Sequence, residues 1–420
     1  MHVLVVGSGL IGTATAWFLR QQGASVTVVD RADGAAMETS YANAGMLTPS
    51  MADPWNAPGV IWKLLRWIGR EDAPLLLRPR ALPGLTGWGA RFLWHSGPRR
   101  FENNMWRNLA LASYSLDELR TLRAELGLEY CQRLEGTLKT FRDEHSFELA
   151  RNIAAQLAGR GVAHDVLDRD GVVALEPSLG PVAGELVGGI HHPDDESGDA
   201  HLFSRALAAA AARAGVDFRF GTTVTGFNRQ GARLTGAQTA SGELTADAFV
   251  IAAGSYSPLL LKGFGIRLPV RPVKGYSITV PCQDPEASPL RPVIDDTLHI
   301  AVTPLGDRIR VAGTAEFAGL DREVSDARIR NLTVTLRALF PALSGVLDAA
   351  TDIHPWSGLR PMSADGVPIL GRTAIDNLYL NTGHGHLGWT MATGSGRAVA
   401  ELIVRGTPSF PIAGYQLDRF

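Results

Sequence analysis

The chain of 420 residues carries 40 Lys and Arg against 42 Asp and Glu, without a basic stripe, which argues against nucleic acid as a partner. Its two cysteines, Cys131 and Cys282, have neither metal-ligand spacing nor a disulfide framework, so we expect no metal site. No stretch reaches the roughly 18 apolar residues of a membrane span, and a strand that begins at residue 2 leaves no room for a signal peptide. We therefore expect a cytoplasmic enzyme.

The first 30 residues predict a strand, a glycine turn, a helix and a second strand. The turn holds Gly7, Gly9 and Gly12 in the spacing Gly-x-Gly-x-x-Gly. Gly7 permits the tight turn, Gly9 lets the backbone approach a pyrophosphate, and Gly12 lets the helix lie close to its strand. Asp30 ends the second strand at a separation typical of a carboxylate that binds an adenosine ribose, which disfavours NADP. The pattern favours a dinucleotide site over a chance glycine-rich turn.

The region that follows differs in character from a Rossmann half. Residues 55–106 are rich in Trp, Pro, Arg and Leu. Helices are predicted at about 102–127 and 144–160, with a strand over 136–141 between them. The first sheet is expected to resume with a helix over 201–214 and strands over 216–220 and 233–253.

A second departure from this sheet spans about 266–350. It contains alternating strands at 276–280 and 308–311 and a helix near 325–340. The C-terminal part then returns with a strand, a glycine-rich turn over 383–390 and a helix that runs to residue 404.

Two departures from one sheet, together with a second glycine-rich turn, favour FAD over NAD as the dinucleotide. The flavin ring needs a site beyond the first glycine turn, and a helix whose N-terminus faces the ring stabilises negative charge there. The alternative is a plain loop whose glycines serve only turn geometry.

Five segments resemble the D-amino acid dehydrogenases, within the FAD-dependent group that also includes glycine oxidase, sarcosine oxidase and D-amino acid oxidase. They are residues 7–12, 39–45, 272–277, 356–371 and 381–390, of which the last two are the most specific. The resemblance implies an α/β fold with a discontinuous, Rossmann-like FAD-binding domain and an interleaved α+β cap domain on an antiparallel sheet. The expected FAD-binding segments are 1–54, 196–265 and 355–420, and the expected cap segments are 55–195 and 266–354.

The resemblance also implies roles for individual residues. Arg360 is expected to grip the substrate carboxylate, because a guanidinium matches a carboxylate with two parallel hydrogen bonds. Tyr276 and His299 are expected to supply a hydroxyl or an aromatic wall over the substrate, with simple packing as the equal alternative. The residues expected to contact non-covalently bound FAD are Gly7, Gly9, Leu10, Ile11, Gly12, Asp30, Arg31, Ser40, Asn43, Ala44, Gly45, Met46, Val224, Ala253, Gly254, Gly385, His386, Leu387, Gly388, Trp389 and Thr390.

The implied reaction is oxidation of a D-amino acid, or of a cyclic imino acid such as a proline derivative, to an imino acid and then a 2-oxo acid and ammonia. A glycine or sarcosine type of oxidase and a flavin-holding electron-transfer subunit are the alternatives. The resemblance favours a quinone or another acceptor over oxygen, and it leaves a homo-oligomer or a hetero-complex open. Residues 60–70 place tryptophans among Lys63, Arg66 and Arg70, which is typical of a peripheral membrane contact or of a helix covering the active site.

Overall fold

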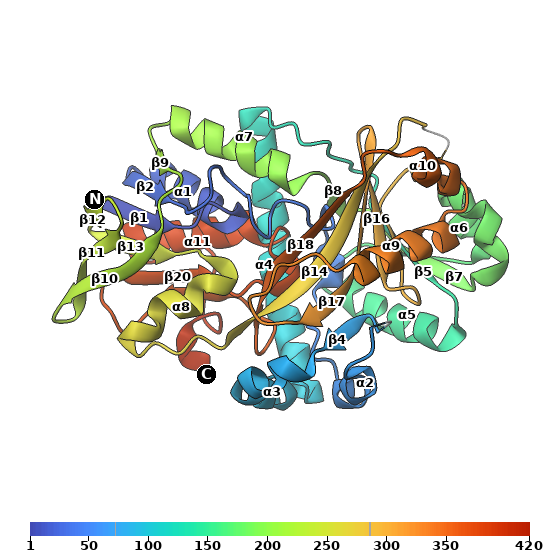
Figure 1. Cartoon of the computed structure of the whole chain (residues 1–420), viewed down its shortest axis with the longest axis horizontal. Helices are drawn as coiled ribbons and strands as arrows, with labels where there is room; N and C mark the ends of the chain where they lie inside the picture. Colours follow the sequence, from blue (N-terminus) through green and yellow to red (C-terminus); the bar gives the residue numbers. More distant parts are fainter. Residues whose placement is uncertain (72, 285–286) are drawn as a thin grey trace.

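The computed structural model of the chain describes residues 1–71, 73–284 and 287–420, and the side chain of Lys63 lies outside the described part. Two sheets lie side by side, each with its own helices (Figure 1). The first sheet has six strands in the order β19-β20-β13-β1-β2-β9, all parallel except β19. Its strands are β1 (His2–Val6), β2 (Ser25–Val29), β9 (Asp217–Arg219), β13 (Ala248–Ile251), β19 (Ile369–Arg372) and β20 (Leu378–Thr382).

The first sheet is buried on both faces, as expected from its continuous apolar strands. On β1, Val3 and Val5 point into one core, while Leu4 and Val6 point into another. The first core is covered by four helices, and a three-stranded sheet with the short helix α8 (Ser257–Leu261) covers the second. The helices are α1 (Leu10–Gln21), α4 (Pro98–Leu126), α7 (Ala200–Arg213) and α11 (Ala392–Arg405), and the three strands are β10 (Val224–Gln230), β11 (Arg233–Thr239) and β12 (Gly242–Leu244).

The second sheet has nine strands, mostly antiparallel, in the order β18-β14-β17-β16-β15-β5-β7-β6, with β4 paired to β17. They are β4 (Leu75–Leu77), β5 (Thr137–Phe141), β6 (Asp165–Leu167), β7 (Gly188–His192), β14 (Val270–Pro281), β15 (Val293–Asp295), β16 (Ile300–Leu305), β17 (Arg308–Phe317) and β18 (His354–Ser363). The short strands β3 (Met46–Leu47) and β8 (Glu196–Ser197) pair with each other.

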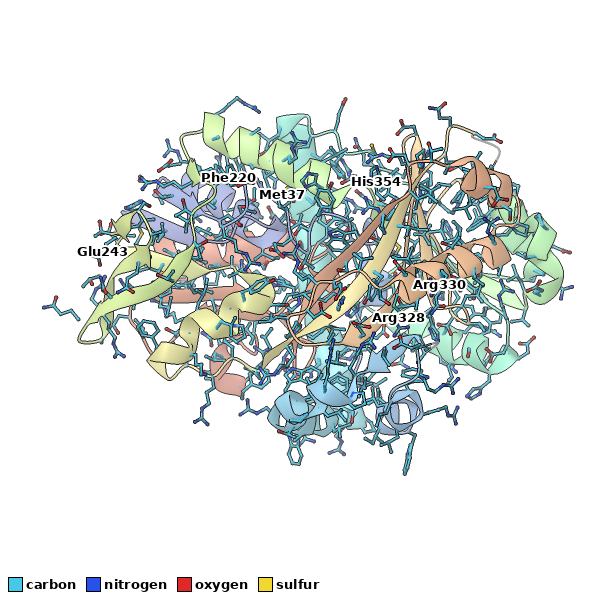
Figure 2. All side chains as sticks on the ribbon, in the orientation of Figure 1. Met37, Phe220, Glu243, Arg328, Arg330 and His354 are labelled. Carbon is cyan, nitrogen blue, oxygen red and sulfur yellow. The ribbon has the colours of Figure 1, made fainter. Side chains whose placement is uncertain are left out.

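Helices also pack against the second sheet. Helix α9 (Asp326–Leu339) is amphipathic: Arg328 is buried against the sheet, whereas Arg330, two residues on, is exposed (Figure 2). The other helices are α2 (Val60–Trp67), α3 (Leu82–His95), α5 (Glu144–Ala158), α6 (Arg169–Leu175) and α10 (Leu343–Ala349).

The observed architecture confirms the predicted fold class and most of the predicted elements. Residues 233–253 contain three strands instead of two, because a tight turn at residues 240–241, between β11 and β12, divides that segment. The division into domains stays a prediction, and two segments cross its boundaries. Strand β18 begins at residue 354 and pairs with β14 of the second sheet, although 355–420 was expected to belong wholly to the FAD-binding domain. Helix α4, expected in the cap, contributes Leu111 and Leu116 to the core of the first sheet.

Candidate functional site

A cavity of about 810 Å³ is lined by residues from both sheets. At one end lie the turn after β1 and the end of β2, and at the other lie β14, β16, β17 and β18. The expected site residues line it with two exceptions, Gly12 and Thr390. The cavity therefore brings together segments separated by most of the length of the chain.

The glycine turn is built by steric exclusion. Gly7 has φ +108°, and a Cβ there would lie 2.6 Å from the carbonyl oxygen of Ala252. A Cβ at Gly12 would overlap the carbonyl oxygen of Gly7, so Gly12 serves helix packing and faces away from the cavity. Gly9 differs, because a Cβ there would meet only Oγ of Ser40, at 3.4 Å, among the described residues beyond its chain neighbours. The open space at Gly9 belongs to the cavity, beside the N-terminus of α1.

Asp30 lies across this turn. Its carboxylate accepts hydrogen bonds from the backbone N–H of Ser8 at 2.6 Å and from the Ser8 hydroxyl at 2.8 Å. Its other oxygen accepts from the N–H of Ala32 at 2.9 Å. Arg31 pairs with Glu38 at 2.6 Å and stacks over the ring of Tyr256, which fixes the rim of the cavity.

Three further segments that the sequence singled out reach the cavity. Residues 42–45 form a turn that leads into β3 at Met46, and in this turn Oδ1 of Asn43 accepts from the N–H of Gly45 at 2.9 Å. Val224 begins β10 and lines the same cavity. Ala253 and Gly254 follow β13 and lie at the carboxyl end of the first sheet. Ligands of open α/β sheets bind at this end of the strands.

The C-terminal glycine-rich turn combines cavity lining with core packing. Leu387 and Trp389 are buried in the core of the first sheet and reach the cavity only in part. Thr390 belongs to the turn before α11, which begins at Ala392. Its hydroxyl accepts a hydrogen bond from the N–H of Thr48 at 3.1 Å. Thr390, expected to contact the cofactor, therefore does not line the cavity.

Two histidines flank Gly385 in this turn. Burial lowers the pKa of His384 to about 3, and its Nε2 lies 3.1 Å from the hydroxyl of Ser395. Burial also lowers the pKa of His386, whose ring stacks on Trp55 at a centroid distance of 5.5 Å. Both imidazoles are consequently neutral at pH 7.

Arg360 is a cationic residue of the cavity wall, which Arg31 and Lys139 also line. Its side chain is partly accessible from the cavity, whereas Nη1 is buried and has no hydrogen-bond partner in the described part of the chain. Burial lowers the pKa of Arg360 to about 10, which leaves the guanidinium charged at neutral pH. The guanidinium lies 5.7 Å from the ring centroid of Trp55. A buried cation without a bonded anion is costly unless a ligand supplies one.

Tyr276 and His299 line the same cavity from the second sheet. Tyr276 is 1% exposed and packs in the core of that sheet, and burial raises the pKa of its hydroxyl. His299 precedes β16, has φ +52° and is exposed. Both the functional and the packing interpretation of Tyr276 are therefore compatible with its position, and its role stays a prediction.

Aromatic side chains of the Trp-rich region line part of the cavity. Trp88 donates from Nε1 to the carbonyl of Met362 at 3.1 Å, which ties α3 to β18. The sequence placed this region on the cap side without identifying individual lining residues; the tryptophan content was the available signal. Besides the expected site residues, the lining includes Trp55, Trp67, Trp88, Phe92, Gly275, Thr314, Phe317 and Trp356.

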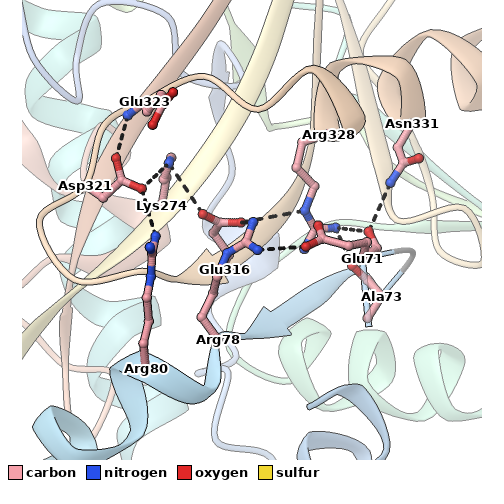
Figure 3. Close-up of polar contacts among 10 residues, drawn as sticks. All are labelled: Glu71, Ala73, Arg78, Arg80, Lys274, Glu316, Asp321, Glu323, Arg328 and Asn331. Carbon is pink, nitrogen blue, oxygen red and sulfur yellow. Dashed lines mark hydrogen bonds and ion pairs between the residues drawn. The ribbon is translucent and has the colours of Figure 1, made fainter. Parts of the chain in front are cut away.

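A buried ionic network anchors this covering segment to the second sheet (Figure 3). Glu316 on β17 is 1% exposed and is approached by Arg78 at 3.0 Å, Lys274 at 3.4 Å and Arg328 at 3.8 Å. Arg328 also donates to the carbonyls of Glu71 and Ala73 at 2.9 and 2.8 Å. The network thereby holds the chain next to Pro74 and Leu75, which line the cavity.

No group of three or more His, Cys, Asp or Glu side chains suited to a metal ion occurs within the described ranges. Among the same residues, no helix is long and apolar enough to cross a membrane.

Known proteins resemble this chain over nearly its whole length. The family described as FAD dependent oxidoreductase matches residues 2–402. A D-amino acid dehydrogenase from Methylobacterium nodulans is 48% identical over 409 residues, covering 97% of this chain and 96% of the relative. One from Granulibacter bethesdensis is 47% identical over 420 residues, with complete coverage of both chains.

Solved structures share the fold at lower identity. The L-proline dehydrogenase from P. horikoshii superposes with a TM-score of 0.79 at 17% identity, covering 99% of this chain and 96% of the other. The glycine oxidase from Geobacillus kaustophilus gives a TM-score of 0.78 at 24% identity, covering 100% and 98%.

Proposed function

Because the chain belongs to the family of FAD-dependent oxidoreductases, we propose that it oxidises a free D-amino acid at Cα. The product is an imino acid, which water hydrolyses to a 2-oxo acid and ammonia. Relatives 47–48% identical over almost the full length carry the name D-amino acid dehydrogenase, and this supports the choice of substrate class.

The residues lining the cavity fit FAD. The space beside Gly9 and the N-terminus of α1, whose N-cap residue Gly9 has no side chain, suit a pyrophosphate, and Asp30 at the end of β2 suits the adenosine ribose. Residues 42–46 and 385–389 line the cavity further along and would hold the flavin. When bound, FAD supplies the acceptor for the hydride that leaves Cα.

Arg360 is the observation that carries the proposal. An amino acid presents a carboxylate, and the unpartnered Nη1 of Arg360 offers a charged donor for it inside the same cavity. Binding by two parallel hydrogen bonds fixes the orientation of Cα, and orientation lowers the barrier of a bimolecular step. An electron-transfer subunit has no need for such a carboxylate clamp, so Arg360 favours the enzyme over that alternative.

The covering aromatic residues have a second effect. Trp55, Trp88 and Phe92 line the cavity and limit its contact with water. Exclusion of water strengthens the attraction between Arg360 and the carboxylate, because charges interact more strongly in a medium of low dielectric constant.

Anaerobic mixing of the holoprotein with single amino acids tests this function. We expect D-amino acids to bleach the flavin absorbance near about 450 nm, and the matching L-enantiomers to leave it unchanged. Bleaching by glycine or sarcosine alone would instead support the oxidase alternative. The absence of bleaching by any amino acid, in protein that dithionite bleaches, would contradict the proposal.

We also propose a quinone as electron acceptor and a peripheral membrane contact at α2. Trp62, Leu65 and Ile68 are 74%, 54% and 39% exposed, while Trp67 lines the cavity, so α2 has an outer apolar side and an inner side over the site. Exposed indole rings beside basic side chains favour a membrane interface. We expect the reduced protein to pass electrons to a quinone analogue faster than to oxygen. We also expect the protein to bind liposomes, and Trp62→Ser to weaken that binding. Formation of stoichiometric peroxide at the full turnover rate would instead place the protein with the oxidases.

A further inference from the structure

Four consecutive carbonyl oxygens of the turn at residues 42–45 are each held by a donor from elsewhere in the chain. Three donors are side chains of the second sheet, on β14, β17 and β16, and the fourth is a backbone N–H. The pairs are Ser277 Oγ to Ala42 O at 2.7 Å, Arg310 Nη1 to Asn43 O at 2.9 Å, Thr303 Oγ1 to Ala44 O at 2.7 Å, and Gly198 N to Gly45 O at 2.9 Å.

Arg310 is the charged member of this set. It is 4% exposed and stands between Thr279 and Thr303, its direct cross-strand partners on β14 and β16. Nε donates to Oγ1 of Thr279 at 2.8 Å, which fixes the plane of the guanidinium. Its ion-pair partner among the described residues is Asp199, whose Oδ2 is 3.9 Å from Nη2 and is shared with Arg308. The positive charge is thus buried and only weakly balanced.

The geometry of a planar trans peptide sets the direction of the donors on the other side of the turn. In each peptide the N–H points opposite to the C=O, and no described peptide is cis. Since Ala42 O and Asn43 O face Ser277 and Arg310, the N–H groups of Asn43 and Ala44 face away from the second sheet. Neither N–H has an acceptor among the described residues, and both residues line the cavity.

We propose that Arg310 is a positioning residue for the flavin: through Asn43 O it fixes and polarises the peptide that joins Asn43 to Ala44, so that Ala44 N–H is a strengthened donor to the polar edge of the bound ring. A cation that withdraws electron density from a carbonyl makes the N–H of the same peptide more acidic, since hydrogen bonds in a chain polarise one another. Reduction makes the ring more electron-rich, so this donor binds the reduced cofactor more tightly than the oxidised one. The inference rests on FAD binding and not on the proposed substrate, because the potential is measured without an amino acid.

The midpoint potential of the bound flavin, measured by dithionite titration against a reference dye, tests this role. Arg310→Met keeps the approximate volume and removes the charge. We expect the reduced cofactor to lose at least tenfold in affinity relative to the oxidised one, which lowers the two-electron potential by about 30 mV. Arg310→Lys keeps the charge, so its midpoint potential should stay close to that of the wild type. Arg308→Met is the matched control, since Arg308 shares Asp199 but is 35% exposed and does not touch the turn.

Asp199→Asn provides a test of opposite sign. It removes the anion beside Arg310 while an amide oxygen still caps α7 by accepting from the N–H groups of His201 and Leu202, so the potential should rise. An unchanged potential in folded Arg310→Met overturns the proposal, as does a fall in Arg310→Lys or Arg308→Met equal to that in Arg310→Met. If Arg310→Met does not fold, Asp199→Asn decides: a rise supports the proposal, and no rise overturns it.

Discussion

The guanidinium of Arg360 occupies the space that a side chain at Gly275 would need. A Cβ at residue 275 would overlap Nη1, Nη2 and Cζ of Arg360, which reaches across from the neighbouring strand β18. The missing side chain at Gly275 therefore leaves the room in which the Arg360 guanidinium lies in the cavity wall.

Gly275→Ala should displace this guanidinium while the distant glycine turn keeps its shape. We expect KM for the D-amino acid to rise at least about tenfold, equivalent to about 1.4 kcal/mol, with FAD binding unchanged. Steady-state kinetics and flavin content measure the two effects. Gly184→Ala, where no described heavy atom beyond the chain neighbours lies within 4 Å of the added Cβ, is the control, and an unchanged KM in Gly275→Ala would show that Arg360 does not bind substrate.

Arg360→Ala should leave the flavin spectrum and the folded state intact, because Nη1 of Arg360 has no hydrogen-bond partner among the described residues. Loss of a buried charged hydrogen-bonded pair costs roughly 2–4 kcal/mol, so kcat/KM should fall roughly 30- to 1,000-fold. Arg360→Lys should restore only part of it, since an ammonium lacks the planar fork. Turnover by the alanine variant at the wild-type rate would place the carboxylate clamp elsewhere.

Two glycines of the same turn should fail in different ways. Gly9→Val should fold and yet bind no FAD, because its side chain meets Ser40 in the protein and otherwise fills the cavity. Gly12→Ala should lower the stability of the apoprotein, since its Cβ would overlap the carbonyl oxygen of Gly7. Thermal unfolding of the apoproteins and flavin fluorescence after denaturation separate these outcomes; a yellow Gly9→Val protein would contradict the assignment.

Glu316→Gln should destabilise the fold by about 3 kcal/mol or more, because it leaves the buried charges of Lys274 and Arg328 without their shared carboxylate. Urea unfolding measures the change. Glu71→Gln is the matched control in the same network: Glu71 is 53% exposed, and its loss should cost less than about 1 kcal/mol. Equal effects of the two substitutions would mean that burial of Glu316 is energetically unimportant.

Acid should weaken the fold through His384. Its pKa falls from 6.5 to about 3 on burial, so the unfolded chain binds more protons than the folded chain between those values. Stability therefore decreases as the pH falls below about 6.5. His384→Asn should reduce the drop in Tm between about pH 7 and pH 5, whereas His354→Asn, at a histidine whose side chain is 67% exposed, should not. The same acid sensitivity in His384→Asn and wild type would assign it to other groups.

Local signals in the sequence explain the parts of the site that could be predicted. Gly7, Gly9 and Gly12 act within one turn of chain, and Asp30 ends the next strand, so their spacing alone indicates a dinucleotide site. The helix and strand periods likewise depend on neighbouring residues. Arg360 became a candidate through its family motif, and the structure places it in the cavity wall.

Contacts between distant segments explain what could not be predicted. Gly275 makes room for a residue on another strand, and Arg310 donates to Asn43 across most of the chain. Neither relationship leaves a periodic trace in the sequence, because pairing between strands is decided by the assembled sheet. Thr390 was expected beside the cofactor from the family resemblance. It lies outside the cavity lining, and its hydroxyl accepts a hydrogen bond from the N–H of the distant Thr48.

The first helix depends on the last one, and this has a consequence for how the protein is made. Helix α11 lies so close to α1 that a Cβ at Gly396 would come within 2.9 Å of the backbone of Ala14. A nascent chain on the ribosome exposes the glycine turn long before β20 and α11 exist to complete its surroundings. We therefore expect the chain to retain FAD only after α11 has been synthesised. When translation is faster than the supply of flavin, colourless chains with unpaired strand edges should accumulate, and such chains are prone to aggregation.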